Sequence, residues 1–322
     1  MTIQQIYNLA IELGIKNDFR PKIQIEKQLK RIKEKYEKLS KDEKALFDTE
    51  KLTNPYTDSR IHFDSGNKNI KRVLAGIDID SAELMIATHL NNNSKKKIDL
   101  VIAHHPEGKG LADLTGVMHL QADVLAQYGV PINVAESLMK IRIDEVTRGV
   151  NPINHYKTVD AAKILRLSFI NVHTPADNMI AKFVEAKMKK DKPEYVGDIL
   201  KSLLEIPEYR EAAKLGAGPR LFSGSPDSRA GKIAFTEITG GAEGSAKIYE
   251  KMAQAGIGTV IAMHQSEEHK KAAEKAHINV VIAGHISSDS IGMNLFLDEL
   301  EKKGMEIVPC SGLIRYSRVK KK

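Results

Sequence analysis

The chain has 322 residues, 42% of them apolar and 28% charged, which suits a globular protein of two domains or of one domain with extensions. It contains no run of about 18 apolar residues, which argues against a membrane-spanning helix, and its single cysteine, Cys310, can form neither an internal disulfide nor a thiolate metal cage. The net charge of +7 comes largely from residues 22–44 and from a basic tail that contains Arg315 and Arg318. We expect a solvated helix face and a frayed end, because few aromatic side chains are interleaved as nucleic-acid binding would require.

The first 70 residues are predicted to form a helical extension without strands. Apolar side chains recur there at helical spacing in two segments, first Ile3, Ile6, Tyr7, Ala10 and Ile11, and then Ile25, Leu29, Ile32 and Tyr36. Residues 54–59 are rich in turn formers and connect this extension to the rest of the chain. The amino terminus lacks the basic start and small-residue cleavage site of a signal peptide, so we expect a cytoplasmic protein.

From Val73 onward, short apolar runs alternate with segments of helical periodicity, which predicts an α/β fold with mostly parallel sheets. The predicted strands are residues 73–78, 100–103, 169–173, 232–235, 259–263, 278–283 and 307–309, and residues 130–134 are expected to begin another. We divide the chain into the extension (1–70), a first α/β unit (71–190), a connector with one short helix (191–230) and a second α/β unit (231–322). Each unit is expected to have three layers.

Four of the predicted strands lead directly into histidine. These histidines are His104 with His105, His173, His264 and His285. Ligands of α/β folds bind outside the carboxyl ends of the strands, and imidazole is the commonest metal ligand among side chains. The pattern therefore predicts one shared metal site at the carboxyl ends of the strands, between the two α/β units.

The sequence His104-His105-Pro106 is the sharpest local motif. Adjacent histidines on an extended backbone point in opposite directions, but at the end of a strand they can serve two metals, or one metal and a supporting partner. Pro106 biases His105 toward an extended conformation. The alternative interpretation is one buried histidine beside an exposed one.

Two of the histidines are followed four residues later by an aspartate. If a helix begins near His285, that residue and Asp289 lie on one face and can share a metal, although Asp289 can also favour a helix N-terminus electrostatically. Pro175 favours a turn after His173. Asp177 then either binds metal or caps the next helix. His173, a candidate catalytic residue like His264, either binds metal or orients a ligand.

His264 and a glycine cluster at residues 240–245 have weaker signals. His264 suits a proton shuttle beside the metals, or else belongs to the solvated face of the helix that follows it. The glycine cluster lies between a strand and a helix, where backbone N–H groups can hold phosphate, but it lacks the Walker lysine and the dinucleotide spacing. A tight structural turn is the favoured interpretation.

Taken in order, these motifs resemble the Ngg-one-interacting-factor-three family, whose members are commonly called GTP cyclohydrolase 1 type 2. The matching pieces, which span roughly residues 70 to 310, are Val73–Asp78, His104-His105-Pro106, His173-Thr174-Pro175-Ala176-Asp177, Gly240-Gly241-Ala242, and Ala283-Gly284-His285 with Asp289. The resemblance implies two divalent metal ions held by His104, His105, Asp177, His285 and Asp289. Zinc, iron, manganese and nickel all suit such mixed ligands. It also implies a ring-shaped homo-oligomer, such as a hexamer, and a small-molecule substrate such as a nucleotide.

The sequence departs from the family pattern at three places. The family usually has glutamate at the position of Asp289, and the shorter aspartate leaves open whether it binds one metal or bridges two. The loop after Pro106 is polar and contains Glu107, which is a candidate for the site, and His264 lies where many relatives have the acid of a Thr-Gly-Glu segment.

Our hypothesis from the sequence is a dinuclear metal-dependent hydrolase in which activated water attacks the substrate. A different metal-dependent hydrolase, a phosphoesterase or an amidase, is one alternative. The other is a non-catalytic metal-binding regulatory adaptor that binds a partner through its lysine-rich helix.

Overall fold

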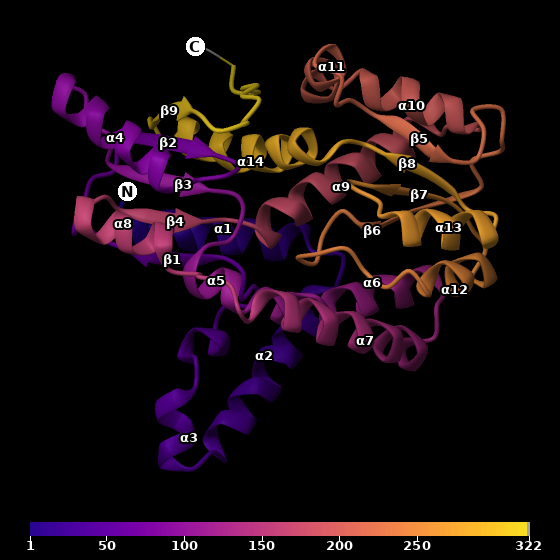
Figure 1. Ribbon diagram of the computed structural model, residues 1–322, viewed down its shortest axis with the longest axis horizontal. Helices are drawn as coiled ribbons and strands as arrows, with labels where there is room; N and C mark the ends of the chain where they lie inside the picture. The colour runs from indigo at the N-terminus through magenta and orange to yellow at the C-terminus, as the bar shows by residue number, and fades with distance from the viewer. Residues whose placement is uncertain (321–322) are drawn as a thin grey trace.

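The computed structural model describes residues 1–320, which fold into two sheets with helices between and around them (Figure 1). The first sheet has five strands in the order β1-β4-β3-β2-β9, and the second has four in the order β5-β8-β7-β6. β1 and β5 run antiparallel to their neighbours, whereas the other paired strands are parallel. The predicted α/β class with mostly parallel sheets is confirmed.

The strands of the first sheet are β1 (Arg60–Phe63), β2 (Arg72–Gly76), β3 (Leu100–Ala103), β4 (Phe169–Asn171) and β9 (Glu306–Pro309). Those of the second sheet are β5 (Arg220–Ser223), β6 (Lys232–Glu237), β7 (Ile257–Ala262) and β8 (Asn279–Ile282). The central strands of both sheets are buried and almost wholly apolar, as parallel strands covered on both faces require.

The helices before the second sheet are α1 (Ile3–Asn17), α2 (Lys22–Glu37), α3 (Lys41–Leu46), α4 (Ser81–Asn93), α5 (Gly108–Ala112), α6 (His119–Tyr128), α7 (Ile132–Val150), α8 (Lys157–Leu165), α9 (Thr174–Asp191), α10 (Val196–Leu204) and α11 (Pro207–Lys214). Those that follow are α12 (Ile248–Gln254), α13 (Glu267–Lys275) and α14 (His285–Lys302). Two short 3₁₀ helices, η1 (Thr49–Leu52) and η2 (Leu114–Val117), complete the secondary structure of the described residues.

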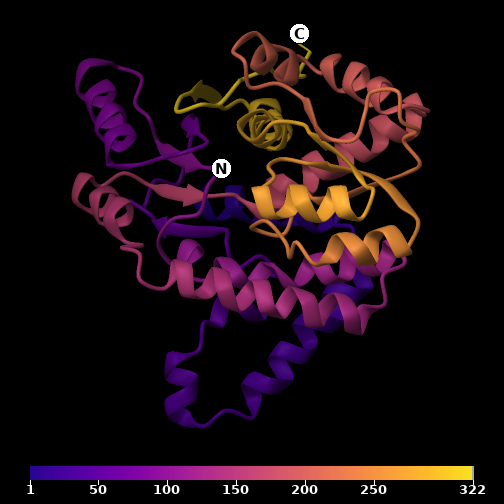
Figure 2. The same cartoon turned by 45° about the vertical axis from the view of Figure 1, so that its right-hand side comes forward.

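Two long helices, α9 and α14, begin at the carboxyl ends of strands and cross each other between the sheets (Figures 1 and 2). Their apolar side chains contribute to the cores of both sheets. Met179 of α9 and Phe296 of α14 pack with the first sheet, and Ile180 and Ile291 of the same helices pack with the second. The pair therefore joins the two α/β units and fixes how their strand ends face each other.

Gly292 of α14 permits the close contact between these two helices. A Cβ atom at position 292 would lie 2.5 Å from the carbonyl oxygen of Ala176 on α9, which is far inside the contact distance. Asp177 follows Ala176 directly, and Asp289 lies one helical turn before Gly292. The missing side chain at 292 thus brings the two aspartates of the predicted site near each other.

We therefore expect Gly292→Ala to push α9 and α14 apart and to weaken metal binding, although residue 292 offers no ligand atom. The free energy of unfolding should fall by about 1–3 kcal/mol, the usual cost of overpacking a filled core. Urea unfolding and a metal titration measure the two effects. The matched control is Gly149→Ala on α7, where a Cβ atom meets open space. That change should be neutral or stabilising because alanine favours helix. Equal behaviour of the two variants would contradict the role of Gly292.

Three predictions of secondary structure outside the candidate site are wrong. Residues 60–63 form β1, which pairs with β4 of the first sheet, so the first 70 residues contain a strand after all. Residues 130–134 do not begin a strand: Pro131 precedes α7, whose buried residues Ala135, Met139 and Ile143 recur at helical spacing. The segment 191–230 holds α10, α11 and β5 instead of one short helix. The division of the chain into four parts stays a prediction.

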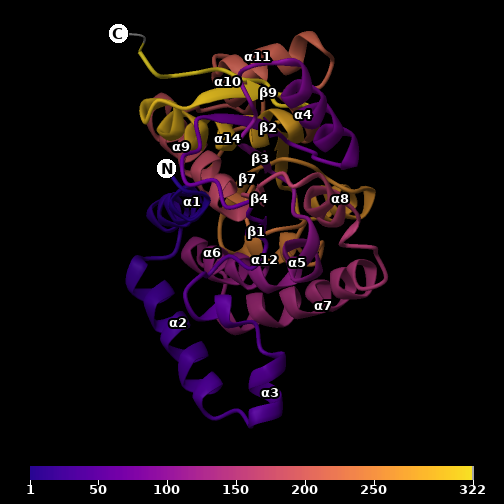
Figure 3. The same cartoon turned by 90° about the vertical axis from the view of Figure 1, so that its left-hand side faces the viewer.

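The two basic segments behave differently. α2 and α3 project from the body of the protein (Figures 1 and 3), and Ile25 is the one buried residue of α2, as expected of a solvated segment. The tail, in contrast, is not frayed at its arginines, because Arg315 pairs with Asp298 and Arg318 pairs with Glu208. No helix within residues 1–320 combines the length and the apolar character needed to cross a membrane.

Candidate metal centre

The structure brings all five predicted metal ligands together. His104 and His105 follow β3 directly, and His285 is the first residue of α14, which places Asp289 on the same face one turn later. The expected turn after His173 is wrong, because α9 begins at Thr174 and contains Pro175 in its first turn. Proline is tolerated there because the backbone N–H groups of the first turn make no hydrogen bond within the helix. Asp177 therefore also projects from the first turn of a helix.

The distances among these side chains divide them into two groups. His104 Nε2 lies 3.4 Å from Asp177 Oδ1 and 3.4 Å from Asp289 Oδ1. The other oxygen, Asp289 Oδ2, lies 3.4 Å from His105 Nε2 and 3.4 Å from His285 Nε2. In each group the ligand atoms lie within 4.8 Å of one another, a spacing that one metal ion can span. Asp289 belongs to both groups through different oxygens, which is the arrangement expected of a bridging carboxylate.

The hydrogen-bonding state of these atoms fits metal ions. Four buried atoms of the cluster have no hydrogen-bond partner within residues 1–320, namely His104 Nε2, Asp177 Oδ1, Asp289 Oδ1 and Asp289 Oδ2. Asp289 is fully buried. A buried polar atom without a partner costs several kcal/mol in general, so native proteins leave few of them. Divalent cations would satisfy all four atoms at once, and mixed nitrogen and oxygen donors suit first-row transition metals.

Hydrogen bonds behind the cluster set the orientation of each imidazole. His104 Nδ1 donates to the carbonyl oxygen of Val172 at 3.0 Å, which leaves Nε2 as the free nitrogen. His105 Nδ1 donates to Asp78 Oδ1 at 2.6 Å and so also presents Nε2 to the cluster. Such support is typical of metal-binding histidines. Sequence analysis missed Asp78 as a functional residue, although it lies at the end of a predicted strand, like the histidines.

His173 lies beside the two groups and is also held from behind. Its Nδ1 donates to Asp58 Oδ2 at 2.8 Å, and its Nε2 lies 3.8 Å from Asp177 Oδ2. Asp58 is fully buried and also accepts a hydrogen bond from the Thr174 hydroxyl at 2.6 Å. His173 can therefore orient Asp177 or contribute its own nitrogen to a metal with His104 and His105. Sequence analysis missed Asp58, which lies in the turn-rich connector and carries no metal-binding pattern.

The charges of the cluster are strongly coupled. Burial disfavours protonation of His104, but the carboxylates of Asp289 and Asp177 outweigh it and raise the pKa of this imidazole. Burial likewise disfavours ionisation of Asp289, but the neighbouring His104 and His105 outweigh it and lower the pKa of that carboxyl. The cluster thus attracts positive charge, which metal ions supply once the imidazoles are neutral.

A cavity of about 30 Å³ adjoins the cluster, with room for about two water-sized groups. It is lined by residues of both α/β units: His173, Asp177, Glu237, Ile238, Thr239, Gly241, Ala242, Met263, His264 and His285. The His264 ring packs edge-on to that of His285 with 5.2 Å between centroids, and burial lowers the pKa of the His264 imidazole. The predicted shuttle and part of the glycine cluster therefore line the cavity, whereas Glu107 does not.

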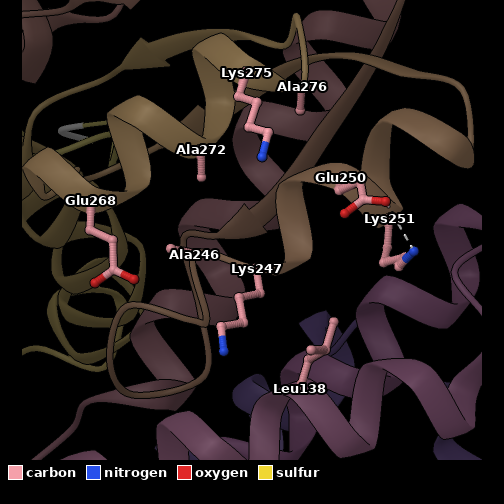
Figure 4. Close-up of a pocket in the computed structure, with 9 residues that line it drawn as sticks. All are labelled: Leu138, Ala246, Lys247, Glu250, Lys251, Glu268, Ala272, Lys275 and Ala276. Carbon is pink, nitrogen blue, oxygen red and sulfur yellow. Dashed lines mark hydrogen bonds and ion pairs between the residues drawn. The ribbon is translucent and has the colours of Figure 1, made fainter.

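A larger cavity of about 440 Å³ lies elsewhere, between α7, α12 and α13 (Figure 4). Leu138, Ala246 and Ala272 form its apolar wall, and lysines and glutamates surround it. Because no predicted site residue lines it and its charged side chains belong to partly or fully exposed residues of both signs, the metal chemistry is expected at the smaller cavity.

Comparisons with known proteins agree with the resemblance at the level of fold. A NIF3 superfamily protein from Sphaerobacter thermophilus superposes with a TM-score of 0.71 and 24% identity, over 97% of this chain and 99% of its own. Reduced HcgD from Methanocaldococcus jannaschii gives 0.44 and 16%, over 75% of this chain and 84% of its own. A Bacillus cereus protein related to NIF3 gives 0.41 and 10%, over 82% and 92%. No family model and no curated protein sequence matches the chain. NIF3 abbreviates Ngg-one-interacting-factor-three, and this chain has the fold of that superfamily along almost its whole length.

Proposed function

We propose that this protein is a dinuclear metal-dependent hydrolase. The observation that carries the proposal is a set of four buried atoms that have no hydrogen-bond partner within residues 1–320, namely both carboxylate oxygens of Asp289, His104 Nε2 and Asp177 Oδ1. One ion would be held by His104, Asp177 and Asp289, and the other by His105, His285 and Asp289. Zinc, iron, manganese and nickel are the candidate metals, because all accept imidazole with carboxylate.

Two divalent ions in such a site lower the pKa of water and polarise the bond to be cleaved. The residues around the ions would position the ligands and transfer protons. Asp78 and Asp58 hold the imidazoles of His105 and His173 in place, so that the ligand set is arranged before substrate binds. His264 faces the cavity beside His285 and is placed to carry a proton between the reacting atoms and solvent.

The substrate is proposed to be a small molecule such as a nucleotide, as the family resemblance implies. The cavity beside the cluster has room for about two water-sized groups, so it can hold reacting atoms of such a molecule but not the whole of it. We further propose a cytoplasmic homo-oligomer and a reaction like that of GTP cyclohydrolase, in which water attacks a carbon of the purine ring. A phosphoesterase or amidase built on the same ligand set is the alternative.

The products formed from GTP distinguish these reactions. We expect protein loaded with zinc, iron, manganese or nickel to release formate from GTP, and the release to stop after chelation and to return with metal. Formate, inorganic phosphate and ammonia are measured in parallel, with His285→Ala as the variant that should be inactive. Release of phosphate without formate would indicate a phosphoesterase, and release of ammonia without formate would indicate an amidase, in place of the cyclohydrolase. No metal-dependent release of any of the three would contradict the proposed reactions on this nucleotide.

A further inference from the structure

Glu237 is a buried acidic residue that lines the small cavity beside the site and belongs to neither group of metal ligands. It is the last residue of β6, and its register partner on β7 is Ala262, two residues before His264. The residue is 6% exposed and lines the small cavity together with Asp177, His264 and His285. It therefore approaches the space beside the metal cluster from the second sheet.

The surroundings of Glu237 differ from those of the other buried acids. Glu208 is paired with Arg318 and Asp18 with Arg20, whereas Glu237 has no lysine, arginine or histidine at ion-pair distance within residues 1–320. Its one side-chain hydrogen bond in that range comes from the Tyr249 hydroxyl, which donates to Oε2 at 3.3 Å. Ionisation of a buried carboxyl group that has one hydrogen-bond donor and no cationic partner within residues 1–320 is unfavourable, so burial favours the neutral acid.

The charged groups around Glu237 act in the same direction. Glu243, from the loop after β6, accepts the Ser266 N–H at 2.9 Å and lies 3.3 Å from His269 Nδ1, so it has the partners that Glu237 lacks. Arg142 of α7 donates to the backbone oxygen of Glu243 at 3.1 Å rather than to either carboxyl group. Burial, with a further contribution from Glu243, raises the pKa of Glu237 to about 8. A carboxyl group that its surroundings keep neutral can donate a proton at neutral pH.

We propose that Glu237 is a further catalytic residue of this site, the general acid that protonates the leaving atom of the substrate. The assignment rests on the proposed hydrolase function. During hydrolysis, water contributes OH to the attacked centre, and the bond to the leaving atom breaks. The carboxyl proton of Glu237 passes to that leaving atom, and the proton given up by water restores the acid. His264 lies in the same cavity and can return this proton.

A pair of substrates tests the acid role in Glu237→Gln. Diphenyl phosphate has a leaving group that needs a proton, whereas bis-p-nitrophenyl phosphate releases a stable anion that does not. We expect the metal-loaded variant to lose about a hundredfold or more in kcat on diphenyl phosphate, the usual contribution of a general acid, with little loss on bis-p-nitrophenyl phosphate. Glu250→Gln, an exposed change on α12, is the matched control and should lose activity on neither. Equal losses on both esters in Glu237→Gln would overturn the acid role.

An infrared titration of the carboxyl band gives a readout that does not depend on activity. Wild-type protein should show a protonated-carboxyl band at pH 7 that disappears as the pH rises through about 8, and Glu237→Gln should lack it. Tyr249→Phe removes a hydrogen bond that favours the anion, so the band should persist to higher pH. The metal content of all three proteins should be equal, because Glu237 is not a ligand.

Absence of the band, or loss of metal in Glu237→Gln, would overturn the assignment. If the metal-loaded wild type hydrolyses neither ester, the result overturns the phosphoesterase alternative and the acid role assigned on phosphate esters, whereas the cyclohydrolase reaction is judged separately by formate release from GTP. The infrared titration would still decide whether Glu237 holds a proton.

Discussion

Asp289→Asn should abolish binding of both metal ions, although it removes a single negative charge. Asp289 Oδ1 lies 3.4 Å from the nitrogen of His104, and Oδ2 lies 3.4 Å from those of His105 and His285. An amide replaces one of these oxygens by an NH₂ group, which cannot bind a cation, and leaves the other as a neutral donor. Loss of a ligand's charge from the centre of a shared site should lower the affinity for each ion by at least the factor of about 10–100 that is known for groups that only support a ligand.

Single-site variants distinguish a bridge from two independent sites. Asp177→Asn should remove only the ion beside His104, and His285→Gln only the ion beside His105, so each should keep about one ion per chain. Glu299→Gln is the matched control, because this carboxylate lies on α14 but pairs with Lys302 instead of the cluster. Metal per chain is measured by plasma mass spectrometry after dialysis. If Asp289→Asn keeps one tightly bound ion, Asp289 does not bridge.

Arg318→Ala is expected to have the largest effect on stability, although Arg318 pairs with none of the predicted metal ligands. Glu208 is fully buried, and Arg318 donates to both of its carboxylate oxygens, at 2.7 Å and 2.8 Å. Removing the arginine leaves a buried carboxylate with Asn294 as its remaining donor within residues 1–320. Breaking a buried ion pair costs about 3–5 kcal/mol, and we expect about 3 kcal/mol because the Arg318 side chain is 23% exposed.

Urea unfolding of three variants tests whether the unpaired charge causes this loss. The double variant Arg318→Ala with Glu208→Gln should be more stable than Arg318→Ala alone, because the amide leaves no buried charge and still accepts from Asn294. Lys320→Ala, at an exposed position of the same tail, should change the free energy of unfolding very little. A double variant as unstable as Arg318→Ala would show that packing of the tail, and not the charge of Glu208, sets the cost.

Much of the candidate metal centre could be predicted from the sequence because it depends on short-range patterns. Strand runs that lead into His104, His105 and His285 place these residues at strand ends, and the four-residue spacing to Asp289 places it on the same helical face. These features are local, so a sequence shows them directly. Whether Asp289 faces one group or two depends on how α9 crosses α14, which involves residues more than a hundred positions apart.

The functional groups that sequence reasoning missed are those whose role comes from tertiary contacts. Asp58 lies in a turn-rich connector, and only the approach of α9 turns it into the partner of His173. Glu237 lies two residues beyond the predicted strand 232–235, and its burial beside Tyr249 becomes visible only when the neighbouring elements are in place. The same reason explains the error at β1, a four-residue strand that exists because β4 offers it an edge.

Pro175 illustrates a second kind of error, in which a residue with two meanings was given the wrong one, and Pro131 has the same helix-starting role in the segment that was predicted to begin a strand. Proline ends helices but also suits their first turn, where no N–H is needed. Both prolines lie at a helix start, before α7 and in the first turn of α9. The buried faces of those helices decide the matter, because Ala135 and Met139 in one, and Ile180 and Val184 in the other, recur at helical spacing.

The most direct test of the central claim is anomalous diffraction from a crystal of the metal-loaded protein, recorded at the absorption edge of the bound metal. The account predicts two peaks per chain, one beside each oxygen of Asp289, with His104 and Asp177 at the first and His105 and His285 at the second. Their separation should be about 3.5–4 Å, as in other two-metal sites. A single peak, or two peaks that Asp289 does not join, would contradict it.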